Sequence, residues 1–288
     1  MLDGLEVASV RFVDGYLPGQ HRSKMRGGCA EFAEHRAYGI GDEVRRLDWR
    51  VLARCDRYYI KQYDEESVLT AVLVTDAGGG MTFAGSGPAK WECARAVSAA
   101  LARLLLAQRD PVGLALAADP LPPFLPPRSE ASQYRVLLDV LHRTAPFGPS
   151  ALGARLAELC ARLRRRGLIF IISDFFCDLA QLSPPLRRLS SRGHQMVLVH
   201  TVAPEELSFP YKDAVRFVDL ENPAESIAVN APAFRDTYLT RLEAHLTSLR
   251  RLCEDVRGDY LPLRTDQSVA AILADYLRKR AARQKTWR

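Results

Sequence analysis

Two short, unbroken apolar stretches of the chain each end in an aspartate. Residues 68–75 (Val-Leu-Thr-Ala-Val-Leu-Val-Thr) precede Asp76, and residues 168–173 (Leu-Ile-Phe-Ile-Ile-Ser) precede Asp174. Runs this short and without alternation predict strands buried on both faces, because a strand with one solvated face would show polar residues at every second position. We therefore expect two central strands of a parallel sheet.

Helical periodicity fills most of the sequence between and after these strands. Apolar residues at helical spacing predict helices over residues 90–108, 133–143, 152–166, 179–192, 231–257 and 268–280. Shorter runs predict further strands at residues 58–63, 112–117, 195–202, 215–220, 226–229 and 259–263. Strands alternating with helices of this length predict an α/β fold, with a doubly wound, mostly parallel sheet and helices on both faces.

Proline, glycine and composition indicate where elements and parts of the chain end. Five prolines within residues 120–127 predict an irregular loop, because proline cannot donate to a strand ladder. Gly167 follows an arginine-rich helix end and is expected to terminate that helix in the C′ position. We expect three parts: a segment 1–66 packed on the core, an α/β domain 67–258, and a C-terminal helix with a basic tail, 259–288.

The two aspartates are the first candidates for chemistry. Both follow buried parallel strands, so both belong at the carboxyl edge of one sheet, where neighbouring strands lie about 4.8 Å apart. Three glycines follow Asp76, which removes side chains from the loop that would face a ligand. The sequence leaves two alternatives open: a shared ligand crevice, or carboxylates that each cap a following turn through backbone N–H groups.

Composition and charge exclude several classes of protein. With 48% hydrophobic and 26% charged residues, the composition is ordinary for a globular protein. No apolar run approaches the roughly 20 residues that span a bilayer, and the first residues lack the pattern of a signal peptide, so we expect no transmembrane segment and a cytoplasmic protein. Six cysteines without a Cys-x-x-Cys pair suggest neither a zinc site nor a redox motif.

The net charge of +6 is concentrated at one end of the chain. Residues 278–288 carry six Lys or Arg and no acid, which equals the whole surplus. A solvated helix end and an electrostatic contact with anionic lipid or nucleic acid both remain open for this tail. Residues 31–66 hold seven Lys or Arg and nine Asp or Glu, a balance that argues against a specific nucleic-acid groove.

Residues 15–66 carry a dense pattern of unlike residue types at set spacings. It includes Glu31-Phe-Ala-Glu-His-Arg36, Gly41-Asp42, Arg45-Arg-Leu-Asp-Trp-Arg50, Ala53-Arg54 and Lys61-Gln-Tyr-Asp-Glu-Glu66. This pattern resembles the signature of the domain-of-unknown-function family 58, whose members resemble von Willebrand factor A domains. Two interpretations of residues 31–66 stay open: a protein-binding surface, and an internal salt-bridge network that pins the segment to the next strand. The candidate binding residues are Arg36, Asp42, Arg45, Arg46, Asp48, Trp49, Arg50 and Arg54.

The resemblance also implies a site at the sheet edge. Von Willebrand factor A domains place a metal-ion-dependent adhesion site there, built from Asp-x-Ser-x-Ser on one loop, a threonine on a second and an aspartate on a third. Asp76 and Asp174 match its aspartates, and Ser150 stands where the threonine would be. Gly78 and Gly80 replace both serines, so we expect a degenerate site that has no metal or cofactor and binds Mg²⁺ weakly at most.

Two classes of function follow. The resemblance implies a non-enzymatic adaptor that works with a MoxR-type AAA+ ATPase in the assembly or activation of other proteins. The alternative is a metal-dependent phosphoryl-transfer or hydrolytic enzyme using Asp76 and Asp174. No Walker A loop follows Gly80, and neither a Gly-x-Ser-x-Gly elbow nor a catalytic Ser-His-Asp set is visible. We therefore favour the adaptor, without catalytic residues.

Overall fold

The computed structural model describes residues 31–37, 39, 49, 51, 58–64 and 70–285. Residues Gly19–Val68 form one unit, and the remainder of the chain forms the other. In the smaller unit, β1 (Glu31–Ala37) pairs antiparallel with β2 (Tyr59–Asp64). The sequence predicted β2 but not β1, because charged residues of both signs obscure the strand pattern in that stretch.

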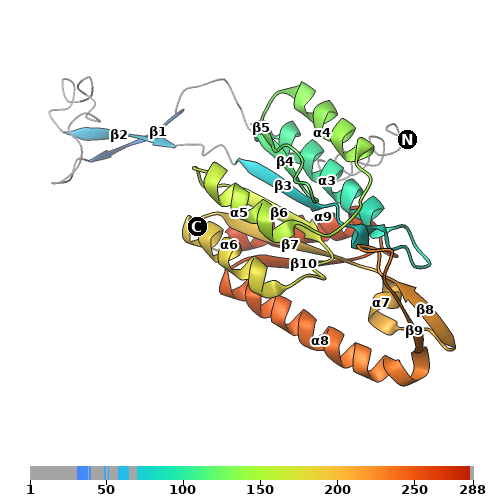
Figure 1. Ribbon diagram of the computed structural model, residues 1–288. Helices are drawn as coiled ribbons and strands as arrows, with labels where there is room; N and C mark the ends of the chain where they lie inside the picture. Colours follow the sequence, from blue (N-terminus) through green and yellow to red (C-terminus); the bar gives the residue numbers. More distant parts are fainter. Residues whose placement is uncertain are drawn as a thin grey trace. The chain divides into compact units, whose positions relative to one another are not determined.

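A six-stranded sheet organises the larger unit, in the order β10-β7-β6-β3-β4-β5 (Figure 1). Its strands are β3 (Ala71–Asp76), β4 (Val112–Ala117), β5 (Leu125–Arg128), β6 (Leu168–Ser173), β7 (Gln195–Val202) and β10 (Asp259–Arg264). All neighbouring pairs are parallel except β4 and β5. The chain moves from β3 outward to β4 and β5, then returns to the other side of β3 for β6, β7 and β10. The order therefore reverses between β3 and β6.

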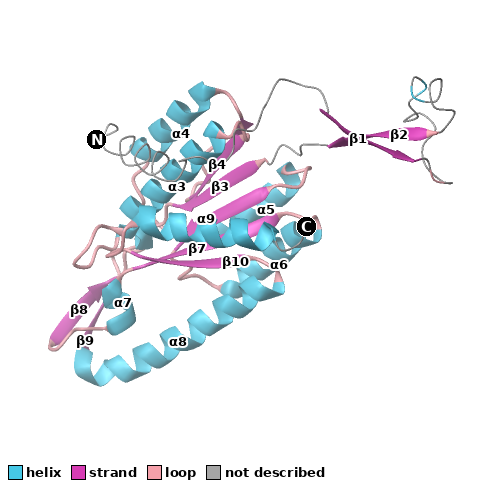
Figure 2. Cartoon of the chain, turned by 180° about the vertical axis from the view of Figure 1, so that it is seen from behind, coloured by secondary structure: helices cyan, strands magenta, loops and turns pink. Residues whose placement is uncertain are grey.

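Helices cover both faces of this sheet, as the sequence predicted. One face carries α3 (Lys90–Ala107), α4 (Ala131–Arg143) and α9 (Val269–Lys285), which Figure 2 shows in front of the strands. The opposite face carries α5 (Leu152–Arg162), α6 (Leu179–Ser191) and α8 (Ala231–Asp255). Along β3, Leu73 packs into the first layer, and Val72 and Val74 pack into the second. The apolar run is continuous because both faces are buried.

Four smaller elements lie among the connections. They are η2 (Gly79–Thr82), α7 (Pro204–Ser208), β8 (Ala214–Val218) and β9 (Ser226–Asn230). Strands β8 and β9 form a separate antiparallel pair. The sequence predicted both strands, whereas η2 and α7 are too short to show helical periodicity.

Two local predictions were wrong. The proline-rich loop contains β5, in which Pro126 and Pro127 lie between the residues that pair with β4. This is possible because β5 is an edge strand and needs ladder bonds on one side only. Helix α5 ends at Arg162, before the basic run, so Gly167 does not cap it. A Cβ at Gly167 would lie 2.4 Å from the carbonyl oxygen of Thr70, which explains why glycine fits there.

Candidate functional site

The loops that follow β3 and β6 meet at the carboxyl edge of the sheet. Asp76 is the last residue of β3, and Asp174 directly follows the last residue of β6. The two strands pair in parallel, with Thr75 opposite Ile172, so the structure brings the two aspartates together. Because the strand order reverses here, this edge is where open α/β sheets form ligand crevices.

Both carboxylate oxygens of Asp76 accept hydrogen bonds. Oδ1 accepts from the backbone N–H of Gly78 at 3.0 Å, and Oδ2 accepts from the hydroxyls of Ser150 at 2.8 Å and Ser173 at 2.6 Å. Burial, together with the neighbouring charge of Asp174, raises the pKa of Asp76 to about 6, although the three hydrogen bonds lower it. Asp76 therefore caps its own turn and also joins the end of β6 to the loop that contains Ser150.

A buried lysine neutralises the second aspartate. The ammonium of Lys90, at the first position of α3, donates to Asp174 Oδ2 at 2.6 Å and to Glu206 Oε1 at 2.7 Å. The other oxygens accept from backbone: Asp174 Oδ1 from Phe176 N–H at 3.1 Å, and Glu206 Oε2 from Ala203 N–H at 2.8 Å. Burial lowers the pKa of Lys90, but the two carboxylates outweigh it and raise that pKa above its ordinary value. The lysine is therefore charged.

The connection between β8 and β9 also reaches this edge. Glu221 accepts from the backbone N–H of Ser150 at 3.1 Å through Oε1. A Cβ added to Gly79 would lie 2.0 Å from the carbonyl oxygen of Leu220. The backbone of Leu220 therefore packs directly against the loop that follows β3. Four segments distant in sequence therefore converge on Asp76 and Asp174; they contain Lys90, Ser150, Glu206 and Glu221.

An imidazole lies beside the site on β7. His200 is opposite Ser173 in the strand register, and its Nδ1 is 2.6 Å from the hydroxyl of Tyr260. Its ring packs edge-on against Phe175 and Phe176. Burial lowers the pKa of His200 to about 4, so the imidazole is neutral near pH 7 and too weak a base for efficient proton abstraction.

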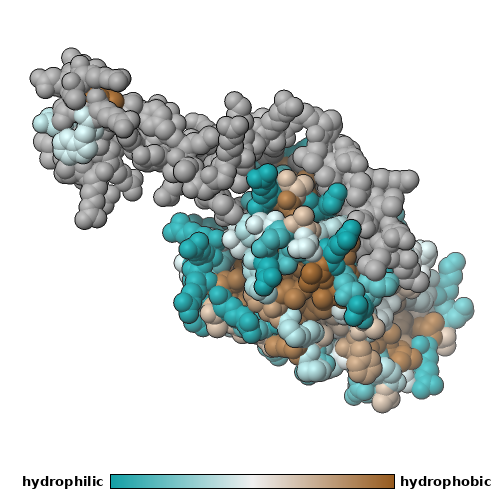
Figure 3. Space-filling view, turned by 90° about the horizontal axis from the view of Figure 1, so that it is seen from above, coloured by the Kyte–Doolittle hydropathy of each residue, from teal (hydrophilic) through white to brown (hydrophobic). Residues whose placement is uncertain are grey.

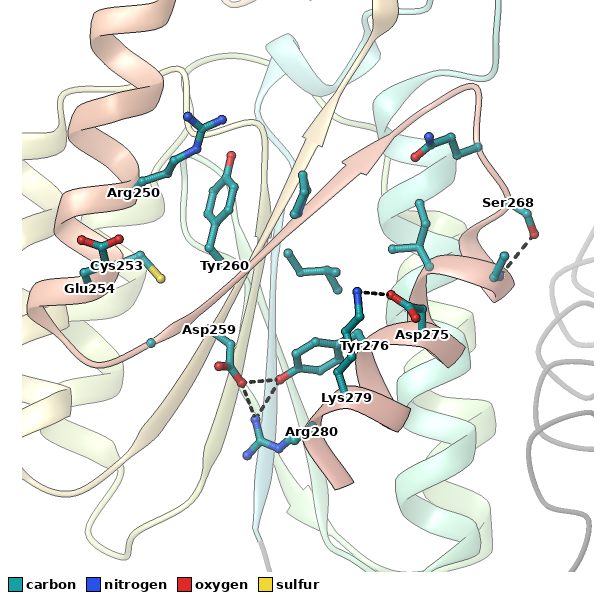
Figure 4. Close-up of a pocket in the computed structure, with 16 residues that line it drawn as sticks. Arg250, Cys253, Glu254, Asp259, Tyr260, Ser268, Asp275, Tyr276, Lys279 and Arg280 are labelled. Atoms are coloured by element: carbon teal, nitrogen blue, oxygen red, sulfur yellow. Dashed lines mark hydrogen bonds and ion pairs between the residues drawn. The ribbon is translucent and has the colours of Figure 1, made fainter. Parts of the chain in front are cut away.

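A groove of about 930 Å³ lies elsewhere, among α8, β10 and α9 (Figure 4). Several of its polar side chains contact one another. The Tyr276 hydroxyl donates to Asp259 Oδ2 at 2.9 Å, and Arg280 donates to the same carboxylate oxygen at 3.1 Å. This network connects α9 to β10, and it does not include the two aspartates at the sheet edge.

The structure assembles some of the predicted site residues and adds others. Asp76, Gly78, Gly80, Ser150 and Asp174 lie together, since Gly78 and Gly80 belong to the loop between the two carboxylates. The residues that sequence reasoning missed are Lys90, Ser173, Glu206 and Glu221. Only Ser173 had a local signal, because it directly precedes Asp174.

Most of the predicted binding residues in the family signature lie outside the described residues. Arg36 belongs to β1, and Trp49 is helical with 61% of its surface exposed. Asp42, Arg45, Arg46, Asp48, Arg50 and Arg54 fall in the parts of the chain that are not described. Their proposed role therefore stays a prediction.

The residues present do not fit the metal ion implied by the resemblance. Gly78 and Gly80 supply no side-chain oxygen, and a Cβ at Gly78 would lie 2.9 Å from the backbone N and Cα of Ser150. The Lys90 ammonium already contacts Asp174. Within the described part of the chain, no three His, Cys, Asp or Glu side chains are grouped so as to hold a metal ion.

This sheet order, with its reversal between β3 and β6, defines a doubly wound α/β protein. Residues 34–248 match the family model described as "Protein of unknown function DUF58", and the chain belongs to that family. It is 29% identical over 285 residues to the uncharacterized protein Rv1480 of Mycobacterium tuberculosis (strain ATCC 25618 / H37Rv), covering 98% of this chain and 88% of the relative.

Solved structures with a similar fold share little sequence with this chain. An aerotolerance-related membrane protein from Bacteroides fragilis NCTC 9343 has 18% identity and a TM-score of 0.48, covering 72% of this chain and 96% of that chain. The SpRpn10 VWA domain has 11% identity and a TM-score of 0.42, covering 72% of this chain and 94% of that chain.

The expected cytoplasmic location is contradicted by these comparisons. The Bacteroides fragilis neighbour is described as a membrane protein, which is at odds with that expectation. Among the helices in the described ranges, none is long and apolar enough to cross a membrane.

Proposed function

We propose that this protein is a non-enzymatic protein-binding module whose partner docks at the carboxyl edge of the main sheet. The observation that carries the proposal is a group of exposed apolar side chains on the loops around the buried polar cluster. Phe147 is 72% exposed, Phe176 is 39% exposed and Leu220 is 38% exposed. Large aromatic side chains beside desolvated polar groups are typical anchors of protein interfaces.

Exposure alone does not mark an interface. On the face shown in Figure 3, hydrophobic side chains reach the surface among hydrophilic ones, as they do on most proteins. Position is what distinguishes Phe147: its backbone N–H donates to Ala77 at 3.1 Å, and the next residue, Gly148, accepts from Gly79 at 2.7 Å. The exposed ring is therefore held by the same loops that hold Asp76.

The polar cluster suits a binding scaffold better than an enzyme that uses Asp76 and Asp174. A catalytic carboxylate needs an oxygen that can reach substrate. Here both oxygens of each aspartate already accept hydrogen bonds, and Asp76 is only 1% exposed. These contacts support a structural role, in which the carboxylates fix the loops that carry the apolar anchors.

We propose a MoxR-type AAA+ ATPase as the partner, in keeping with the family to which the chain belongs. Two surfaces are candidates for this contact: the loops around Phe147, and the family-signature segment that contains Arg45 and Arg46. The role in assembly or activation of other proteins rests on the same family relationship.

Co-purification with a MoxR-type ATPase of the same organism tests the proposal and separates the two surfaces. Phe147→Ser should strongly reduce capture, since it removes an exposed anchor without touching the core. Val136→Ser is the matched control, because Val136 is 45% exposed on α4 and lies outside the loops of the site. Loss of capture only in the Arg45→Glu, Arg46→Glu double variant would move the contact to the signature segment. Undiminished capture by all variants would refute both surfaces.

A further inference from the structure

Lys90 is the least expected residue of the site. A lysine is seldom buried unless it is paired, yet Lys90 is 1% exposed. Its ammonium contacts the carboxylates of Asp174 and Glu206 at 2.6 and 2.7 Å. It also lies 5.6 Å from the ring centre of Phe83 and 5.2 Å from that of Phe176, within the range of cation–π attraction. All of these contacts favour a fixed positive charge at this point.

The surrounding groups require such a charge. Asp174 and Glu206 are both buried or nearly so, with side chains 9% and 12% exposed, and Asp76 and Glu221 lie on neighbouring loops. Several carboxylates brought together in a dry site repel one another unless a cation lies between them. In a metal-dependent adhesion site, the divalent ion supplies that charge.

The loop that contains Gly78 and Gly80 leaves room for the lysine and its carboxylate partner. A Cβ at Gly80 would lie 3.3 Å from Asp174 Oδ2, the same oxygen that accepts from Lys90. A serine at this position would crowd the carboxylate that the lysine already occupies. Serine at position 78 would meet the backbone of Ser150. The two glycines and the lysine are therefore parts of one arrangement.

We propose that Lys90 is a tethered cation that replaces the divalent metal of this site. The positive charge between the carboxylates is then always present, and the site does not depend on Mg²⁺. The inference deepens the proposed function, because it describes how the same docking edge is held together. It does not need the partner for its test. Failure of partner capture and failure of cation replacement are therefore distinguishable.

The experiment measures thermal unfolding of the whole chain with EDTA, MgCl₂ or MnCl₂. Wild-type protein should show the same Tm in all three, since its site has no place for a metal. Lys90→Ser leaves Asp174 and Glu206 without their cation and opens space for a hydrated ion. In EDTA its Tm should be lower than that of the wild type, and about 5 mM MnCl₂ should raise it by about 3 °C or more, as mass action predicts for submillimolar binding.

Two further variants serve as controls. Lys212→Ser changes an exposed lysine and should show no Mn²⁺ response. Adding Asp174→Asn to Lys90→Ser should abolish the response, because it removes the carboxylate that would hold the ion. A Lys90→Ser protein that folds and ignores Mn²⁺ would overturn the proposal.

Titration of the wild type covers the case in which Lys90→Ser does not fold. We expect no Mn²⁺ binding in a calorimetric titration up to about 1 mM, a concentration at which organised hard-cation sites are filled. Micromolar binding that disappears in Asp76→Asn would overturn the proposal.

Discussion

Replacement of Asp76 by asparagine should stabilise this protein at neutral pH. The side chain is 1% exposed and lies beside Asp174, so its negative charge is costly, and the pKa of Asp76 is raised from 3.8 to about 6. A carboxyl whose pKa is higher in the folded state contributes stability that is fully present below pH 3.8. That contribution is lost as pH rises through 6. Asparagine keeps the shape and has no charge to bury.

The structure sets the size of the effect. A shift from 3.8 to about 6 is about 2 pKa units, and at 1.36 kcal/mol per unit it corresponds to about 3 kcal/mol. The amide oxygen of the introduced asparagine can still accept from Gly78, and its amide nitrogen can donate to the oxygens of Ser150 and Ser173. Those two hydroxyls then lose the acceptor for their own hydrogens, which costs about 1 kcal/mol for each hydroxyl. We expect a net gain of about 1 kcal/mol at pH 7 and a net loss of about 1 kcal/mol at pH 4, where Asp76 is protonated and has no charge to bury.

Urea unfolding of wild type and Asp76→Asn at pH 4, 5, 6 and 7 measures this difference directly. The difference in unfolding free energy should shift in favour of Asp76→Asn mainly between pH 4 and pH 6 and should level off by pH 7. Asp139→Asn on α4 is the control for the chemical change, since the Asp139 side chain is 44% exposed in a surface ion pair and its loss should cost less than about 1 kcal/mol. A wild type more stable than Asp76→Asn at pH 7 would refute the reasoning, because the hydrogen bonds would then outweigh the cost of the charge.

Two other predictions concern packing and hydrogen bonds away from the site. Gly167→Ala should destabilise the fold by about 1–3 kcal/mol, since its Cβ would meet the Thr70 carbonyl oxygen. The control, Gly153→Ala on α5, should be neutral or stabilising by up to about 1 kcal/mol. Equal urea midpoints for the two variants would contradict this prediction. Arg155→Met should cost about 3 kcal/mol in urea unfolding, because the buried guanidinium donates to the Leu116 carbonyl at 2.7 Å and to a second backbone carbonyl. Wild-type stability of Arg155→Met would show that water replaces these bonds.

Much of the fold could be predicted because hydrophobic patterns are local. The runs before Asp76 and Asp174 needed no tertiary information to be recognised as strands, and two-sided burial follows from their lack of alternation. Short elements escaped the same reasoning. The strand that contains Pro126 and Pro127 contradicts proline statistics, and it forms because one of its sides needs no partner.

The candidate site was only partly predictable, because its charge balance depends on contacts that are distant in sequence. Lys90 lies 84 positions from Asp174 and 116 positions from Glu206. In the sequence it is one lysine at the start of a helix, and nothing nearby distinguishes it from a solvated one. Pairing of β3 with β6 places Asp174 beside Asp76, and packing of α3 then brings the lysine to it.

The outer strands of the main sheet both carry proline, and this affects how the protein meets other chains. Directly after β10, the N–H of Thr265 donates to the Val202 carbonyl of β7. By alternation, the backbone nitrogen of Pro262 faces away from β7, where an added strand would need a donor. At the opposite edge, β5 contains Pro126 and Pro127. Edge strands interrupted in this way resist edge-to-edge pairing with strands of other chains, which limits aggregation. A partner must then recognise loops and side chains rather than extend the ladder.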